Sequence, residues 1–151
     1  MTSEAQYDAQ GLVRMDEEAC WEFLEHHHLG RIAFVRHHRP LVYPVNYVID
    51  DESVVFRTSP GSKLGAALRG SLVAFEVDEA DELFESGTSV LVHGRVLEVT
   101  EPVERDRLAD RLVRTWAPGE RDHVIRVQTH WLTGRSIPLS GEDDGLFADG
   151  G

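Results

Sequence analysis

The sequence predicts a mainly β domain, a six-stranded antiparallel split β-barrel with three short helices at its periphery. Two observations lead to this fold class. Apolar and polar residues alternate over several short segments, as in strands that bury one face. Tight turns join the first three of these segments, and strands connected in this way form an antiparallel meander. Six such strands in one small domain favour a closed or split barrel.

The first element expected is a helix over residues 17–28. Asp16 is a plausible N-cap, and apolar residues follow it at helical spacing until Gly30 ends the pattern. Cys20, the only cysteine, lies on the apolar stripe, so we expect a buried, inert thiol and no internal disulfide. Residues 1–12 are polar and are expected to be frayed.

Three strands are expected next, over residues 31–35, 41–49 and 53–58. Short polar turns separate them, which favours antiparallel pairing of neighbours. Pro40 and Pro44 each remove a backbone donor. We therefore expect both prolines at an edge, at a bulge or at a strand start.

The second half should add a short helix ended by Gly70, two strands, a helix that opens at Pro102, and a last strand. The strands are expected over residues 72–77, 88–99 and 123–132. Gly94 suits a bend or bulge in the middle one. Six acidic side chains between residues 76 and 85 indicate a solvated loop. We expect one domain over residues 1–139 and a disordered acidic tail over 140–151.

Net charge limits the classes of partner. The formal charge is −12, from 27 acidic and 15 basic residues, which argues against binding to nucleic-acid phosphates or to an anionic membrane surface. The start of the chain has no secretory signal pattern, and no apolar run is long enough to span a bilayer. We expect a cytoplasmic protein.

The turn at residues 54–64 collects groups that suit an anion. Arg57 and Lys63 bring two cations to it, and Thr58 and Ser62 bring hydroxyls. The backbone N–H groups that open the following helix also favour anions. This composition indicates a phosphate site, although a solvated strand-to-helix turn would contain similar residues.

Three motifs, in this order and spacing, resemble the pyridoxamine 5'-phosphate oxidase-like family of FMN-binding split-barrel proteins. They are Pro44-Val45-Asn46, Phe56-Arg57-Thr58 with Ser62-Lys63, and Val73-Ala74-Phe75-Glu76-Val77-Asp78. The resemblance runs from about Cys20 to about Pro138. Within the family, the chain is most similar to the small actinobacterial-type flavin and deazaflavin oxidoreductases.

The resemblance implies a bound flavin, which would be FMN, with FAD or a deazaflavin coenzyme as alternatives. It also implies roles for particular residues. Arg57 and Lys63 would pair with the 5'-phosphate, and Thr58 and Ser62 would donate hydroxyls to it or to the ribityl chain. The cofactor-binding residues expected in this way are Val45, Asn46, Arg57, Thr58, Ser62, Lys63, Leu64 and Trp131. Val45 and Asn46 would bind the isoalloxazine ring through their backbone, whereas Trp131 would reach it across a dimer interface.

The expected function is a flavin-dependent oxidoreductase that transfers hydride between the flavin and a small substrate of unidentified structure. A deazaflavin-dependent reductase and a non-enzymatic flavin or haem carrier or sensor remain alternatives. No catalytic residue is assigned, because the cofactor carries the chemistry in such proteins. No metal site is expected, since three adjacent histidines at residues 26–28 cannot all face one ion.

A homodimer is also expected. The interior of so small a barrel is filled by its own side chains, so a flat cofactor ring must lie outside it. A second subunit related by a two-fold axis would provide the surface that excludes water from the ring.

Overall fold

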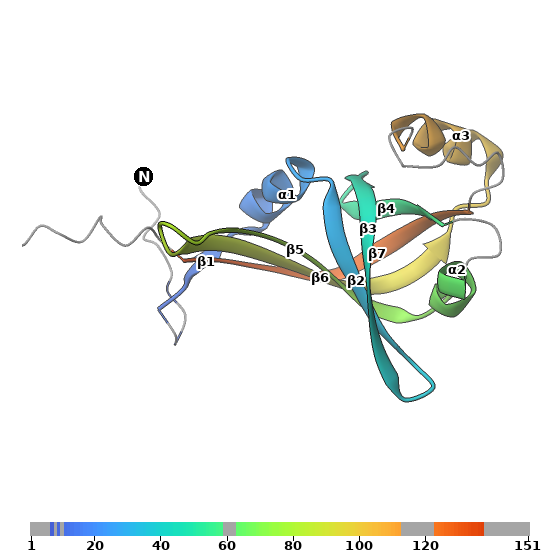
Figure 1. The fold of residues 1–151 in the computed structure, drawn as a ribbon. Coiled ribbons are helices and arrows are strands. Elements are labelled where there is room, and N and C mark those ends of the chain that lie inside the picture. The colour runs from blue at the N-terminus through green and yellow to red at the C-terminus, as the bar shows by residue number, and fades with distance from the viewer. Residues whose placement is uncertain (1–6, 8, 10, 59–62, 113–122, 138–151) are drawn as a thin grey trace, which may run out of the picture.

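The computed structural model describes residues 7, 9, 11–58, 63–112 and 123–137. Seven strands and three helices follow one another along this part of the chain (Figure 1). The strands are β1 (Val13–Met15), β2 (Leu29–Arg36), β3 (Arg39–Ile49), β4 (Ser53–Thr58), β5 (Leu72–Asp81), β6 (Ser86–Glu98) and β7 (His123–Ile137). The helices are α1 (Glu17–Glu25), α2 (Lys63–Leu68) and α3 (Pro102–Arg111).

Six of the strands close into an antiparallel barrel, which confirms the predicted fold class. The sheet order is β1-β7-β4-β3-β2-β5-β6, and a further pairing of β7 with β6 closes the ring. Short β1 pairs with the far end of β7, from Val13 opposite Ser136 to Met15 opposite Gly134. Sequence patterning missed β1 because three residues are too few to show alternation.

Two seams of the barrel are short. β3 pairs with β4 only over Tyr47–Ile49, and β2 pairs with β5 only over Arg31–Ala33. By contrast, β5 and β6 pair over ten consecutive positions, and β6 and β7 pair over a still longer stretch. The long β5–β6 hairpin and β7 extend to one side of the barrel in Figure 1.

The acid-rich segment is not the loop that the sequence predicted. β5 runs through it to Asp81, which pairs with Ser86 at the start of β6. Its carboxylates project from an extended hairpin instead. Charged residues have low strand propensity, but cross-strand pairing overrides propensity where a long partner is available.

Two buried clusters hold the fold together. The larger fills the barrel with residues such as Phe56, Phe75 and Ile32, and Cys20, Trp21 and Leu24 of α1 join it. The smaller lies under α3 and consists of Val55, Val99, Leu108, Leu112 and Val124. Because α3 covers the outer face of β4, this strand is buried on both sides.

Helix α1 starts as expected but ends early. The Ala19 N–H donates to Asp16 Oδ1 at 2.8 Å, which confirms Asp16 as the N-cap. The helix stops at Glu25 because the chain joins the sheet soon afterwards, where the His28 carbonyl accepts from Tyr47 N–H at 2.9 Å. Cys20 is buried as predicted, and burial raises the pKa of its thiol to about 11.

Helix α3 starts at Pro102 as predicted, and Glu101 caps its first turn. Val103 is 75% exposed, and the helix packs through Leu108 and Leu112. The acidic tail lies outside the described residues. Gly94 lies at a bulge, as expected, where the β6–β7 register shifts between His93 and Gly94.

Candidate functional site

The candidate site starts where β4 ends. Arg57 and Thr58 are the last two residues of this strand and pair with Val124 and His123 of β7. Ser62 lies outside the described residues, and Lys63 opens α2. Helix α2 has only six residues, so a helix dipole contributes less to an anion site than the sequence suggested.

Arg57 is held in place by α3. Its Nη2 donates to the carbonyl of Ala109 at 2.8 Å, near the C-terminal end of the helix, where the same carbonyl also accepts from Leu112 N–H at 3.1 Å. This contact fixes the guanidinium beside the end of β4. Because arginine has five N–H donors, the group can still bind an anion while it holds α3.

The Thr58 hydroxyl gives the strongest indication that part of the site is missing from the described residues. The residue is 4% exposed, and its hydroxyl oxygen has no hydrogen-bond partner among the described residues. Helix α2 packs closely against it, since a methyl group on Gly65 would lie 2.8 Å from Thr58 Oγ1. Buried hydroxyls are normally satisfied, so this one indicates a partner outside the described residues.

Val45 and Asn46 lie on β3, one step beyond its pairing with β4. Tyr47 faces Phe56 in the last pair, so the register brings Val45 and Asn46 toward Thr58 and Arg57. The Tyr47 N–H donates to the His28 carbonyl, next to β2. Backbone N–H and C=O groups of successive strand residues point to alternate edges. Those of Asn46 therefore point away from β2, toward the edge that continues from β4. Within the described chain, Arg39–Asn46 pairs with β2 but not with β4, which leaves backbone groups available to a ligand. This open edge also explains how β3 accommodates two prolines.

Leu64 is partly buried and packs against the barrel core. In its own chain, Trp131 lies far from the loop. β7 pairs Val124 with Arg57, and Trp131 is seven residues further on, roughly 20 Å along the strand. The structure therefore brings together Val45, Asn46, Arg57, Thr58 and the start of α2, but not Trp131.

Trp131 belongs to an outer row of side chains that crosses four strands. Register places Ala33 opposite Ala74, Ala74 opposite His93, and His93 opposite Trp131. The rings of His93 and Trp131 lie 4.4 Å apart between centroids, and His93 Nδ1 is buried without a partner in the described chain. The row lines an open groove of about 590 Å³.

The outer face around this groove is unusually apolar for exposed surface. Val35, Val42, Leu72 and Trp131 are each more than half exposed, at 68%, 61%, 62% and 59%. Patches of this kind on a small protein mark interaction surfaces. We call these four residues the outer apolar face.

A second feature missed by sequence reasoning is an ion cluster around the buried Asp50, beside the start of β4. The Asp50 carboxylate accepts from Arg107 at 2.7 Å, from Arg111 at 3.0 Å and from Arg126 at 3.0 Å. Hydrogen bonds from Arg107 and Arg126 hold the pKa of Asp50 well below its usual range. The cluster fastens α3 to β3 and β7, and α3 in turn positions Arg57. No local sequence motif predicts it, because each of the three arginines is more than 50 residues from Asp50 along the chain.

Over the same described ranges, no group of three or more His, Cys, Asp or Glu side chains is arranged to hold a metal ion. None of the described helices is both long enough and apolar enough to cross a membrane. The chemical groups at the site are thus one guanidinium, one unpaired hydroxyl, an open strand edge, and the start of a helix that carries Lys63.

These features define a class of protein, an antiparallel split barrel with a candidate anion site where β4 leads into α2. Residues 16–136 match the family described as pyridoxamine 5'-phosphate oxidase. The chain belongs to this family, which confirms the resemblance inferred from its motifs.

Individual relatives agree with this assignment. An uncharacterized protein of Mycobacterium tuberculosis is 31% identical over 134 residues, which span 85% of this chain and 88% of that protein. The solved structure of an FAD binding protein from Mycobacterium smegmatis is similar with a TM-score of 0.76 at 29% identity, and covers 83% of this chain and 98% of its own. An FAD-binding protein from Mesorhizobium loti shares the fold, with a TM-score of 0.69 at 22% identity over 84% of this chain and 99% of its own.

Proposed function

We propose that this protein is a flavin-dependent oxidoreductase that binds FMN at the end of β4. The observation that carries the proposal is the buried hydroxyl of Thr58 at the end of β4, which has no partner among the described residues. Similarity to FAD-binding proteins supports a flavin as the ligand class. A bound flavin would supply hydride transfer at its N5 atom, while the protein provides binding and orientation.

The residues fit the parts of FMN in a definite order. Arg57, Thr58, Ser62 and Lys63 would hold the 5'-phosphate, and Leu64 would close the side toward the core. The open edge of β3 at Asn46 would hydrogen-bond the isoalloxazine ring, whereas the backbone of Val45 is directed to Gly30 of β2 and would contribute only its side chain. A ring that lies along this edge is outside the barrel, which is filled by Phe56, Phe75 and their neighbours.

The protein should act as a homodimer. Trp131 lies roughly 20 Å along β7 from the residue opposite Arg57, so in its own chain it is too distant to cover the ring. A two-fold related copy would bring its Trp131 to the site and cover the outer apolar face. Dilution below the dimer dissociation constant should then release the flavin.

The phosphate assignment is tested by comparing FMN with riboflavin, which lacks the phosphate. Arg57→Ala and Lys63→Ala should each weaken FMN binding by about 1.5–3 kcal/mol, the range for a hydrogen bond to a charged group. Riboflavin binding should barely respond to Lys63→Ala. Fluorescence quenching of either flavin gives both affinities. Equal losses for the two ligands would refute the phosphate site.

Arg95→Ala is the matched control, since Arg95 also lies on a strand and donates to a backbone carbonyl, that of Gly70, at 2.6 Å. It should leave both affinities unchanged.

Lys63 allows a second test, because it is the only lysine in the chain. An amine-directed reagent can therefore modify only Lys63 and the N-terminal amine. FMN should protect Lys63 from modification, riboflavin should not, and the N-terminus serves as the internal control in peptide mass spectrometry. Turnover of an added electron donor by the flavin-loaded protein separates an enzyme from a carrier or sensor.

A further inference from the structure

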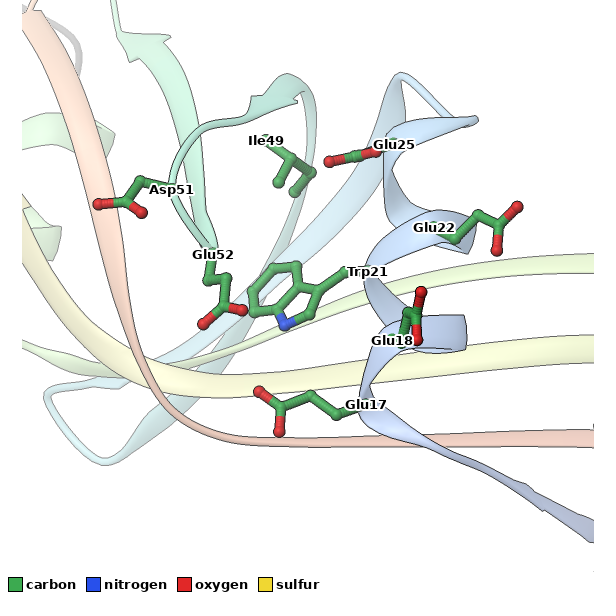
Figure 2. A pocket seen from close by; sticks show the side chains of 8 residues that line it. All are labelled: Glu17, Glu18, Trp21, Glu22, Glu25, Ile49, Asp51 and Glu52. Carbon is green, nitrogen blue, oxygen red and sulfur yellow. The ribbon is translucent and has the colours of Figure 1, made fainter. Parts of the chain in front are cut away.

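A deep acidic hollow lies between α1 and the β3–β4 turn, away from the cofactor site. Its volume is about 870 Å³ (Figure 2). We call it the acidic trench, and its lining residues are Glu17, Glu18, Trp21, Glu22, Glu25, Ile49, Asp51 and Glu52. None of its six carboxylates forms an ion pair within the described chain. Six like charges without counterions repel one another, so a positively charged partner would relieve the repulsion.

Trp21 gives the trench a second, independent feature. Its side chain projects from α1 into the middle of the carboxylates, with the indole nitrogen on the side that faces Glu17 and Glu52 (Figure 2). The residue is 8% exposed, and its Nε1–H has no hydrogen-bond acceptor in the described chain. A buried donor that lacks an acceptor among the described residues is unusual, and an acceptor from a bound partner would satisfy it.

The ligand that fits both features is a basic peptide. A single metal ion does not fit, because no three of the described carboxylates converge on one point. A peptide instead distributes several positive charges along its side chains. Its backbone carbonyls are the acceptors that an indole N–H requires.

This chain itself carries such a peptide at the turn between β2 and β3. The basic hairpin tip is Arg36-His37-His38-Arg39, and all four residues are exposed. Neither arginine forms an ion pair in the part of the chain that the structure describes. His37 and His38 form the two-residue turn with φ values of 50° and 62°, and Arg36 pairs with Arg39. The tip thus presents two guanidinium groups and two turn carbonyls together.

The tip cannot reach the trench of its own molecule. In Figure 1 the β2–β3 hairpin extends from the barrel on the side away from α1. A contact between tip and trench therefore requires two copies. A smaller hollow of about 360 Å³ joins the trench to the outer apolar face, since Glu17, Trp21 and Glu52 line it together with His130 and Trp131.

We propose that the basic hairpin tip of one copy docks in the acidic trench of a second copy. A two-fold axis makes both contacts at once and closes the assembly as a dimer. Arg36 and Arg39 pair with trench carboxylates, and a turn carbonyl accepts the Trp21 Nε1–H. This contact needs no flavin, so it stands apart from the proposed cofactor site.

Charge reversal tests the contact by sedimentation equilibrium of the flavin-free protein. Arg36→Glu/Arg39→Glu gives an acidic tip opposite an acidic trench. Glu18→Arg/Glu22→Arg places two cations in the trench, whose charge changes from −6 to −2. Each variant alone should dimerise at least about tenfold more weakly than the native chain, because the first makes like charges meet and the second removes most of the attraction for the basic tip. An equimolar mixture should recover dimers, since the native tip of the second variant then meets the unchanged trench of the first.

Controls separate this contact from the overall charge of the protein and from cofactor binding. Asp106→Arg/Asp110→Arg makes the same charge change at the same spacing on exposed positions of α3, and should change the dimer constant less than about threefold. Trp21→Phe, which removes the N–H and keeps an aromatic ring, should weaken the dimer several-fold while thermal unfolding verifies the fold. FMN titration of every variant reports the cofactor site separately. Three outcomes would each overturn the proposal. The native chain could stay monomeric, or the mixture could fail to recover dimers. Spermidine, used as a free polycation, could bind in a way that depends on Trp21 without any effect on dimerisation.

Discussion

Two carboxylates on neighbouring parts of the barrel show opposite behaviour. Asp50, at the end of β3, accepts hydrogen bonds from Arg107, Arg111 and Arg126. Glu76, on β5, has a single arginine within reach, Arg31 at 3.5 Å, and that arginine lies closer to Asp78 at 3.0 Å. Both acids are partly or fully withdrawn from water. They differ in the number of cations that face them.

The pKa values follow this difference. Hydrogen bonds from Arg107 outweigh burial at Asp50 and hold the pKa of its carboxyl below the ordinary range. At Glu76, burial comes first and the neighbouring Asp78 carboxylate adds to it, so the pKa rises to about 7 despite Arg31. Burial alone does not decide the charge state of an acid; the local excess of cations or anions decides it.

The Asp50 cluster and the Glu76–Asp78 pair also differ in their structural roles. The Asp50 cluster fastens α3 to the barrel, and α3 holds Arg57 through the Ala109 carbonyl. The proposed cofactor site would therefore depend on an ion cluster whose residues are not among those proposed to bind the flavin. Glu76 and Asp78 hold no such element in place, and lie on the hairpin that extends from the barrel.

The largest expected effect comes from Asp50→Asn. A neutral amide leaves three guanidinium groups without their shared anion, and removing one partner of a buried ion cluster costs about 3 kcal/mol. Urea denaturation at pH 7 measures the loss. Asp51→Asn is the matched control, because Asp51 is exposed and one residue away, and it should change the free energy of unfolding by less than about 0.5 kcal/mol.

The fall in the free energy of unfolding at low pH gives a second measurement of the same cluster. The folded-state pKa of Asp50 lies below its ordinary value of 3.8, so its contribution is present above that pH and is lost as the pH falls below it. Native protein should lose stability steeply in this range, and Asp50→Asn should flatten the decline. Identical declines in the two proteins would show that the arginines do not stabilise the ionised form.

The effect of Glu76→Gln on the free energy of unfolding should be opposite in sign to that of Asp50→Asn, and smaller. The raised pKa means that Glu76 favours folding when protonated, and that this contribution disappears as the pH rises through about 7. At pH 8 the substitution should stabilise the protein by about 1–2 kcal/mol after allowance for solvent screening, and near pH 4 it should be neutral. Thermal or urea unfolding at the two pH values tests this, and a stabilisation independent of pH would contradict it.

The smallest effect is expected from Asp78→Asn. Removing this anion should lower the pKa of Glu76 from about 7 toward its ordinary 4.5 without reaching it, since burial is the larger cause. Stability at pH 7 should change by less than about 1 kcal/mol. Carboxyl chemical shifts in an NMR titration give the pKa directly. Asp81→Asn, further along the same strand, should leave that pKa unchanged.

The comparison also marks the limits of reading the sequence. Residues 53–58 were assigned to a strand with the right bounds, because alternation and flanking turns are local signals. The course of β5 through Glu79 and Asp81 was missed, since charged residues in a strand have no local signature and only the pairing with β6 keeps them extended. The Asp50 cluster was missed for the same reason: Arg126 is 76 residues from Asp50 in the chain.

The sequence by itself determined the fold class, the family, and the types of residue gathered where β4 leads into α2. These properties depend on local periodicity and on short motifs, which can be recognised within single segments of the sequence. The tertiary structure alone decided that the Thr58 hydroxyl is buried without a partner among the described residues, that β3 leaves an edge open beside it, and that α3 holds Arg57 in position. It also decided that Trp131 lies on an outer face away from the loop of its own chain. Each of these depends on strand register and barrel closure, which bring residues together across long sequence separations and cannot be read from any one segment.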